Sequence, residues 1–170
     1  MTLPSTIKNI FILCGSDNVN KDSPIEIVNG IVSIGLSFIE QYKNVQVFLS
    51  GIIPRDSAVS VKRDIIDYIN HHIEIFGNNN EGFYYLNQGK QWTNKDNLSR
   101  KDLFFKDNLH LIEKGYINCL KSSLMHFKVL QINWLKVRHM KTTMLICLIM
   151  NNFHLYQKNI LEHQVMVIPM

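Results

Sequence analysis

The order of apolar runs and helix signals near the N-terminus restricts the fold more than any other feature. Ile10–Cys14 is an apolar run that ends at Gly15. Ser23–Glu26 supplies a helix N-cap, a proline at the first helical position and a glutamate that completes a capping box. A second apolar run, Val45–Leu49, follows that helix. Strand, helix and strand in this order predict two parallel strands joined by a right-handed crossover.

The same alternation continues with a second helix and a third strand. Apolar residues recur at helical spacing from Val61 to Ile73, and the glycine- and asparagine-rich residues 77–82 end that segment. The polar stretch 87–106 predicts a long loop in which Trp92 is a packing anchor. We therefore expect a parallel sheet with strands near 9–14, 45–50 and 82–86 and helices near 24–43, 58–76 and 110–127.

Composition and charge indicate one globular domain followed by a different kind of tail. Of the 170 residues, 46% are hydrophobic and 19% are charged, as in globular chains. Residues 1–110 hold 11 Lys and Arg against 12 Asp and Glu, whereas residues 111–170 hold 7 against 2. Helical periodicity also weakens beyond residue 128. We expect a domain over residues 1–127 and a basic, apolar tail of uncertain structure over residues 128–170.

Targeting signals and macromolecular partners find little support in the sequence. Thr2–Lys8 is short and polar, so no signal peptide is expected and a cytoplasmic location is favoured. Met144–Met150, the longest apolar run, is far below the roughly 20 residues that span a bilayer. The tail's cations permit weak attraction to nucleic acid, but cations this widely spread are more typical of a solvated face.

Cysteine and histidine spacing argues against disulfides, metals and other cofactors. The cysteines Cys14, Cys119 and Cys147 are odd in number and far apart, which predicts buried, reduced thiols. The seven histidines show no metal-binding helix spacing. Neither a dinucleotide-binding glycine motif nor a Walker-type loop occurs. We therefore expect no cofactor.

Asp107 and His110 form the motif in this sequence that most strongly suggests a catalytic site. They are three residues apart, just before an expected helix, so both side chains can leave one loop. The Asp107 carboxylate can then accept a hydrogen bond from one imidazole nitrogen and leave the other as a general base. The alternative interpretation is that Asp107 caps the following helix and His110 is an ordinary surface residue.

These residues, in this order, resemble the SGNH (GDSL-type) serine hydrolases. The likeness rests on Asp-x-x-His followed by Leu and Lys-Gly-Tyr over 107–116, on the strand end Gly15–Asn18, and on Ser-Gly-Ile-Ile-Pro-Arg over 50–55. The resemblance implies a three-layer α/β/α, flavodoxin-like parallel sheet. It also implies an esterase or deacetylase that acts on small acyl ester or O-acetyl substrates. Asp107 and His110 would be its catalytic pair, with Gly15, Asp17 and Asn18 at the oxyanion or substrate-binding position.

Two departures from the family pattern bear on activity. No Gly-Asp-Ser segment, which holds the family's nucleophile, occurs in these 170 residues. Asp17 stands where the family has an oxyanion-binding Asn, and an ionised carboxylate repels a developing negative charge. We therefore expect an N-terminally truncated domain that is inactive as given, with Ser16 and Ser50 as the first substitute nucleophiles to consider.

Two functional interpretations stay open. The first is an ester hydrolase completed by an upstream nucleophile. The second is a non-catalytic remnant or interaction module, of the kind that derives from a mobile-element protein. A nucleophile block encoded upstream of Met1 would separate the two.

Truncation has a consequence for the sheet. In a 2-1-3-4-5 strand order, the strand over Ile10–Cys14 would lack the neighbours that precede it in the family. We expect that strand to form an exposed edge and to promote self-association. The alternative is that Met144–Met150 or Val165–Ile168 covers it.

Overall fold

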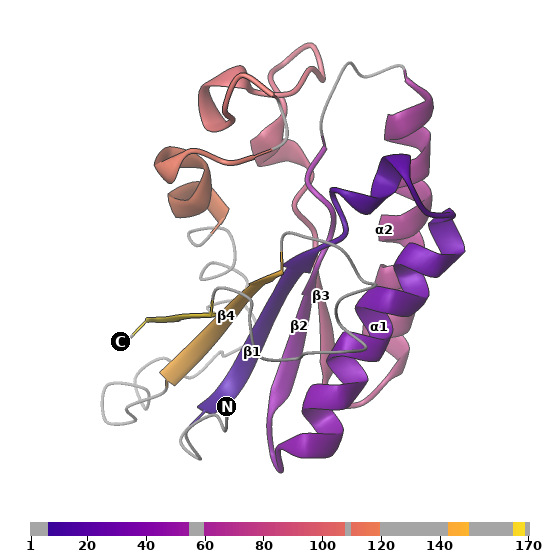
Figure 1. Cartoon of the computed structure of the whole chain (residues 1–170), viewed down its shortest axis with the longest axis vertical. Coiled ribbons are helices and arrows are strands. Elements are labelled where there is room, and N and C mark those ends of the chain that lie inside the picture. Colours follow the sequence, from indigo (N-terminus) through magenta and orange to yellow (C-terminus); the bar gives the residue numbers. More distant parts are fainter. Residues whose placement is uncertain (1–6, 55–59, 108–109, 120–142, 150–164, 169–170) are drawn as a thin grey trace.

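The fold is a five-stranded sheet with helices on one face and an irregular layer on the other. The computed structural model describes residues 7–54, 60–107, 110–119, 143–149 and 165–168 (Figure 1). The strand order is β3-β2-β1-β4-β5. The elements are β1 (Ile7–Cys14), α1 (Pro24–Gln41), β2 (Gln46–Ser50), α2 (Val61–Asn79), β3 (Phe83–Leu86), β4 (Thr143–Ile149) and β5 (Val165–Ile168), with three short 3-10 turns: η1 (Asn18–Asn20), η2 (Lys90–Trp92) and η3 (Lys101–Leu103).

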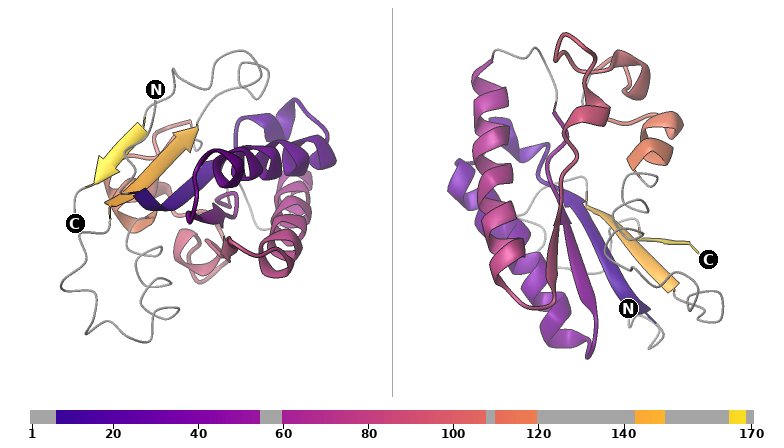
Figure 2. Two further views of the ribbon diagram at one scale, coloured as in Figure 1. Left: turned by 90° about the horizontal axis from the view of Figure 1, so that it is seen from below. Right: turned by 180° about the vertical axis from the view of Figure 1, so that it is seen from behind.

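The predicted three-layer α/β/α architecture is confirmed. β1, β2 and β3 are mutually parallel, and α1 and α2 pack side by side over one face of the sheet (Figures 1 and 2). Segment 87–119 packs against the other face and ends in helical residues 113–119. The helix expected near 110 begins at residue 113, three residues later, because Leu111 forms a backbone bridge with Phe104. Its expected continuation to 127 lies outside the described residues.

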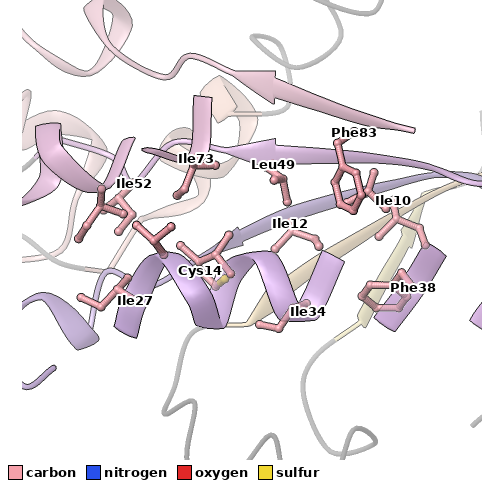
Figure 3. Close-up of a cluster of buried hydrophobic side chains, with 14 of the residues drawn as sticks. Ile10, Ile12, Cys14, Ile27, Ile34, Phe38, Leu49, Ile52, Ile73 and Phe83 are labelled. Carbon is pink, nitrogen blue, oxygen red and sulfur yellow. The ribbon is translucent and has the colours of Figure 1, made fainter. Parts of the chain in front are cut away.

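β1 contributes to two hydrophobic cores because its side chains alternate between the faces of the sheet. Ile10, Ile12 and Cys14 lie in a first core cluster with residues of α1 and α2, and each is at most 5% exposed (Figure 3). Phe11 and Leu13 lie in a second core cluster with residues of segment 87–119. Burying each large apolar side chain stabilises the fold by about 1.5–3 kcal/mol. The strand therefore holds both layers to the sheet.

Both long helices begin at a side-chain cap. The Ser23 backbone N–H donates to Glu26 Oε2 at 2.9 Å, and Ser23 Oγ accepts from the Glu26 backbone N–H at 3.4 Å, which completes the predicted capping box. Ser60 Oγ accepts from the Arg63 backbone N–H at 3.2 Å, so α2 begins at residue 61, three residues later than expected. These caps place the two helix starts at the carboxyl-end edge of the sheet.

β4 covers the edge of β1 that the sequence led us to expect open. β4 runs parallel to β1 from the Ile7–Thr143 pair to the Cys14–Ile149 pair, and β5 pairs antiparallel with β4. The expected exposed edge at residues 10–14 is therefore wrong: the first of the two C-terminal apolar runs pairs with β1, and the second pairs with the first. The physical reason is that β4 offers a backbone partner along almost the whole length of β1.

This pairing predicts slow amide exchange in β1. In the full chain, the amides of Ile10–Leu13 should exchange roughly 1000-fold or more slowly than in an unfolded chain, because the strand is paired on both sides. Hydrogen–deuterium exchange with fragment mass analysis measures this. A chain ending at residue 142 is the matched comparison: it lacks β4 and β5, and should lose this protection and elute as a larger species. Fast exchange at residues 10–13 in the full chain would contradict the pairing.

Candidate active site

Asp107 and His110 hold each other within one short loop. Asp107 Oδ2 accepts a hydrogen bond from His110 Nδ1 at 2.7 Å, and Asp107 Oδ1 accepts one from the His110 backbone N–H at 3.0 Å. With the proton on Nδ1, the imidazole presents Nε2 as a hydrogen-bond acceptor. Their side chains are 46% and 43% exposed, so solvent reaches the pair. Helical structure begins only at residue 113, so Asp107 closes the loop and does not cap that helix.

Burial of the flanking residues fixes this loop. Phe104 and Leu111 face each other across a backbone bridge, and the Phe105 N–H donates to the His110 carbonyl at 2.8 Å. Phe104 and Leu111 are 7% and 4% exposed and belong to the second core cluster, together with Phe11 of β1. His110 is therefore connected to the sheet through its immediate neighbours.

Trp92 anchors the rest of the layer, as predicted. Its side chain is fully buried, and its Nε1 donates to Gln88 Oε1 at 3.0 Å. The ring also packs against Phe104, with 5.9 Å between ring centroids. Trp92 is thus a packing residue that supports the strand-like segment beside His110.

An ion network spans the outside of the loop. Arg100 donates to both carboxylate oxygens of Asp102, at 3.2 and 3.0 Å, and Lys114 donates to the same carboxylate from the following helical segment. Arg100 Nη1 also donates to the Gln91 carbonyl at 3.2 Å. Hydrogen bonds from Arg100 and then Lys114 lower the pKa of Asp102 to about 2. The network fastens the two ends of the segment that contains Asp107 and His110.

Gly15 makes the turn that follows β1. Its φ of +96° lies in the left-handed region, and a Cβ there would come within 3.1–3.2 Å of Ile52, Ile27 and Ile31. The Asn18 backbone N–H donates to the Gly15 carbonyl at 3.1 Å and closes the turn. Glycine is required here because the backbone conformation and the close packing both exclude a larger residue.

Asp17 and Asn18, the other two residues at the expected oxyanion position, belong to the turn that follows β1. Asp17 is half-buried and precedes the 3-10 turn η1. Asn18 is 4% exposed, and its side-chain Nδ2 donates to Asp22 Oδ2. The amide that an oxyanion would need is therefore bound to a carboxylate of the same loop.

The hydroxyl and thiol groups near the strand ends are poorly placed as nucleophiles. Ser50 is 1% exposed and its Oγ donates to the Gly51 carbonyl at 3.1 Å. Cys14 and Cys119 are buried, as predicted, and burial raises the pKa of Cys119 to about 12. Ser16 is half-buried in the turn after β1. Of these groups, Ser16 has the greatest access to solvent.

Asn70 is a positioning residue that the sequence interpretation missed. Its Oδ1 accepts from the Ile52 backbone N–H at 2.6 Å, and its Nδ2 donates to the Ile52 carbonyl at 3.0 Å. This pair of bonds fixes the segment after β2 against α2. The available signal was an asparagine between the apolar residues Ile69 and Ile73, close to the buried side of the helix.

The segments that carry these residues share one edge of the sheet. Segments 15–23 and 100–119 both lie beyond the carboxyl ends of β1, β2 and β3 (indigo and salmon in Figure 1). This is the edge where open α/β sheets bind ligands. Within the described ranges, no group of His, Cys, Asp and Glu side chains has the geometry of a metal site. In the described part of the chain, no helix is both long enough and apolar enough to cross a membrane.

Asp102→Asn tests the ion network. Because the pKa of Asp102 falls from 3.8 to about 2 on folding, its stabilisation is present above pH 3.8 and is lost as pH falls through about 2. Solvent screening of the half-exposed carboxylate keeps the effect below about 1 kcal/mol. Urea unfolding of the variant should therefore differ from wild type at neutral pH and converge with it near pH 2. Asp96→Asn, in a neighbouring exposed turn, is the control, and equal behaviour of the two variants would contradict the network's role.

Comparisons with known proteins support the fold. No protein-family model matches the chain, and neither does any curated protein sequence. Among solved structures, a Streptococcus pneumonia protein provisionally described as a platelet activating factor aligns with a TM-score of 0.59 and 20% identity over 70% of this chain. A GDSL-like lipase from Bacteroides thetaiotaomicron aligns with a TM-score of 0.55 and 16% identity over 72% of it.

The extent of these alignments limits what they establish. This chain spans 59% and 62% of the two neighbours' lengths, and at such low identity the likeness concerns the backbone alone. Together with the parallel sheet and its flanking layers, it shows that the described chain has an SGNH (GDSL-type) hydrolase-like fold.

Proposed function

We propose that this chain carries the general-base pair of an SGNH-type ester hydrolase that acts on acyl esters or O-acetyl groups. His110 is the general base, and Asp107 orients it. The observation that carries the proposal is the 2.7 Å contact between Asp107 Oδ2 and His110 Nδ1, reinforced by the bond from the His110 backbone to the second carboxylate oxygen. The pair lies at the edge of the sheet where ligands bind in open α/β folds.

The geometry suits proton transfer to and from Nε2. With Nδ1–H bound to Asp107, Nε2 can take the proton from a hydroxyl as it attacks the ester carbonyl, and can then give it to the leaving alcohol. The imidazolium that forms between these steps is stabilised by the Asp107 carboxylate. Half-exposure of both side chains gives a substrate access to the pair.

The nucleophile and the oxyanion donor are the missing parts of this proposal. A Gly-Asp-Ser segment does not occur in the 170 residues, and the Ser50 hydroxyl is buried. The carboxylate of Asp17 would repel an oxyanion, and the Asn18 amide is bound to Asp22. Within the proposal, Gly15, Asp17 and Asn18 line the oxyanion side, and a serine from outside this sequence completes the site.

A second candidate function is a non-catalytic interaction module that keeps the fold. The observation that favours it is the bond between Asn18 and Asp22, because it commits one of the two amide N–H donors of Asn18 to the protein's own loop. In this interpretation the bond between Asp107 and His110 serves only to close its loop.

We predict that residues 1–170 hydrolyse an aryl acetate no faster than the His110→Ala variant. Without a serine to activate, general-base assistance has no hydroxyl to act on, and any residual rate should be the same in both proteins. Steady-state turnover of p-nitrophenyl acetate measures this, with His72→Ala as a surface-histidine control. Robust turnover that only His110→Ala abolishes would refute the prediction, and Ser16→Ala and Ser50→Ala would then locate the substitute nucleophile.

A second prediction concerns the tautomer of His110. In its neutral form His110 should carry its proton on Nδ1, because Asp107 accepts from that nitrogen. Long-range ¹⁵N–¹H NMR correlation distinguishes the two ring nitrogens. Asp107→Ala should shift the proton to Nε2, whereas His72, whose Nδ1 contacts the Tyr68 carbonyl at 2.9 Å, should be unchanged. An Nε2-protonated His110 in the wild-type chain would remove the basis of the proposed general base.

A further inference from the structure

A polar cavity separate from the Asp107–His110 pair lies between α2 and the loop after β3. Its volume is about 370 Å³. From α2 it is lined by Arg63, Asp67, His71 and Glu74, which lie on one stripe of the helix because they are spaced by three or four residues. Tyr85 and residues of the following loop form the opposite wall. Asp67 and His71 are exposed and Glu74 is half-buried, as on an ordinary solvated helix face. Arg63 is buried, so it is the member of the stripe that calls for a functional explanation.

The guanidinium of Arg63 is buried without a full set of hydrogen-bond acceptors in the described part of the chain. The residue is 6% exposed, yet its Nε and Nη2 have no hydrogen-bond partner among the described residues. Burying a guanidinium with unpaired donors is unfavourable, and such groups in native proteins are normally satisfied by an acceptor. Asp67 lies one turn along the helix: burial raises its pKa and the Arg63 charge acts against that rise, so the two side chains attract each other. Within the described ranges, however, no ion pair or hydrogen bond joins them, and the Nε and Nη2 donors stay unsatisfied. An acidic oxygen group of a ligand would satisfy Arg63.

The two carboxylates on the stripe determine what else the ligand must carry. Asp67 and Glu74 both act on Tyr85: burial raises the pKa of Tyr85 to about 12, and the charges of Glu74 and Asp67 add to that rise. A simple anion in the cavity would be attracted by Arg63 and repelled by these carboxylates. A simple cation would be attracted by the carboxylates and repelled by Arg63. A ligand with one charge of each sign matches both ends of the stripe.

We propose that this cavity binds a small zwitterionic ligand. Its acidic oxygen group, a carboxylate or a phosphate, lies against Arg63, and its protonated amine lies against Asp67. Arg63 and Asp67 are separated by about 6 Å of helical rise, which suits a ligand whose charges are a few bonds apart. The site uses neither Asp107 nor His110, so it does not depend on the proposed esterase function.

Binding to the full chain tests the proposal with simple probes. γ-Aminobutyrate represents the carboxylate class and phosphoethanolamine the phosphate class, while butyrate and butylamine each carry one of the two charges. At about ten times its Kd, the matching zwitterion should raise Tm by roughly 3 to 6 °C. Butyrate and butylamine should bind at least about tenfold more weakly, because each loses one charged contact. Equal binding of butyrate, or no binding of either zwitterion, would overturn the proposal.

Matched substitutions on α2 localise the effect. Arg63→Gln and Asp67→Asn should each weaken the zwitterion about tenfold or more, whereas Lys62→Gln, at an exposed neighbour that does not line the cavity, should leave binding unchanged. Without ligand, Arg63→Gln should unfold at the same Tm or higher, because it removes an unsatisfied buried charge. His110→Ala should bind the zwitterion normally, which separates this site from the esterase proposal.

One further variant can overturn the site. Asp56 precedes α2 in the sequence and lies outside the described residues. If Asp56→Asn lowers Tm and the loss disappears in an Arg63→Gln background, then Asp56 is the partner of Arg63 and no ligand is needed. Independent effects of the two substitutions are the expected result.

Discussion

Burial of β1 between two hydrophobic layers is the interaction on which the rest of the structure depends. Ile10 and Ile12 hold the layer of α1 and α2, while Phe11 and Leu13 hold the layer of residues 87–119. The turn at Gly15 continues directly from the first set, and the loop of His110 is attached to the second through buried neighbours. A substitution in β1 would therefore disturb both sides of the candidate active site, although none of its side chains takes part in the proposed chemistry.

The two polar features of the molecule differ in how their charges are stabilised. The Asp107–His110 pair is half-exposed, and each group has a partner within the loop. Water and local hydrogen bonds therefore both stabilise the charge on the pair. Arg63 is buried, and two of its nitrogens lack a partner among the residues that the structure describes. The first arrangement is complete within its own loop. The second is complete only when something else supplies an acceptor.

Much of the fold follows from local sequence signals, whereas long-range pairing does not. The capping box at Ser23, the apolar periodicity and the Gly-rich breaks predicted α1, α2 and three strands because each is encoded within a few neighbouring residues. The partner of β1 was predicted wrongly. An apolar run such as Thr143–Ile149 is compatible with a strand or a buried helix, and its pairing is decided by tertiary packing.

In the candidate site, too, the local contacts could be predicted from the sequence and the inward-facing polar residues could not. The contact between Asp107 and His110 follows from their spacing, and the turn at Gly15 follows from a glycine at a strand end. Arg63 and Asn70 were missed because a polar residue on a helix usually faces solvent, and only the packed structure shows that both face inward.

The position of β4 also has a consequence for biosynthesis. β1 leaves the ribosome early, but its β4 partner follows only after roughly 130 further residues, which takes about 6 to 26 s at ordinary translation rates. Throughout that interval one side of an apolar, sheet-competent strand has no partner from its own chain. Nascent chains held close together on one messenger RNA would offer such a partner. The yield of correctly assembled protein should therefore depend on how quickly the last thirty residues are made and on whether a chaperone holds the strand until they arrive.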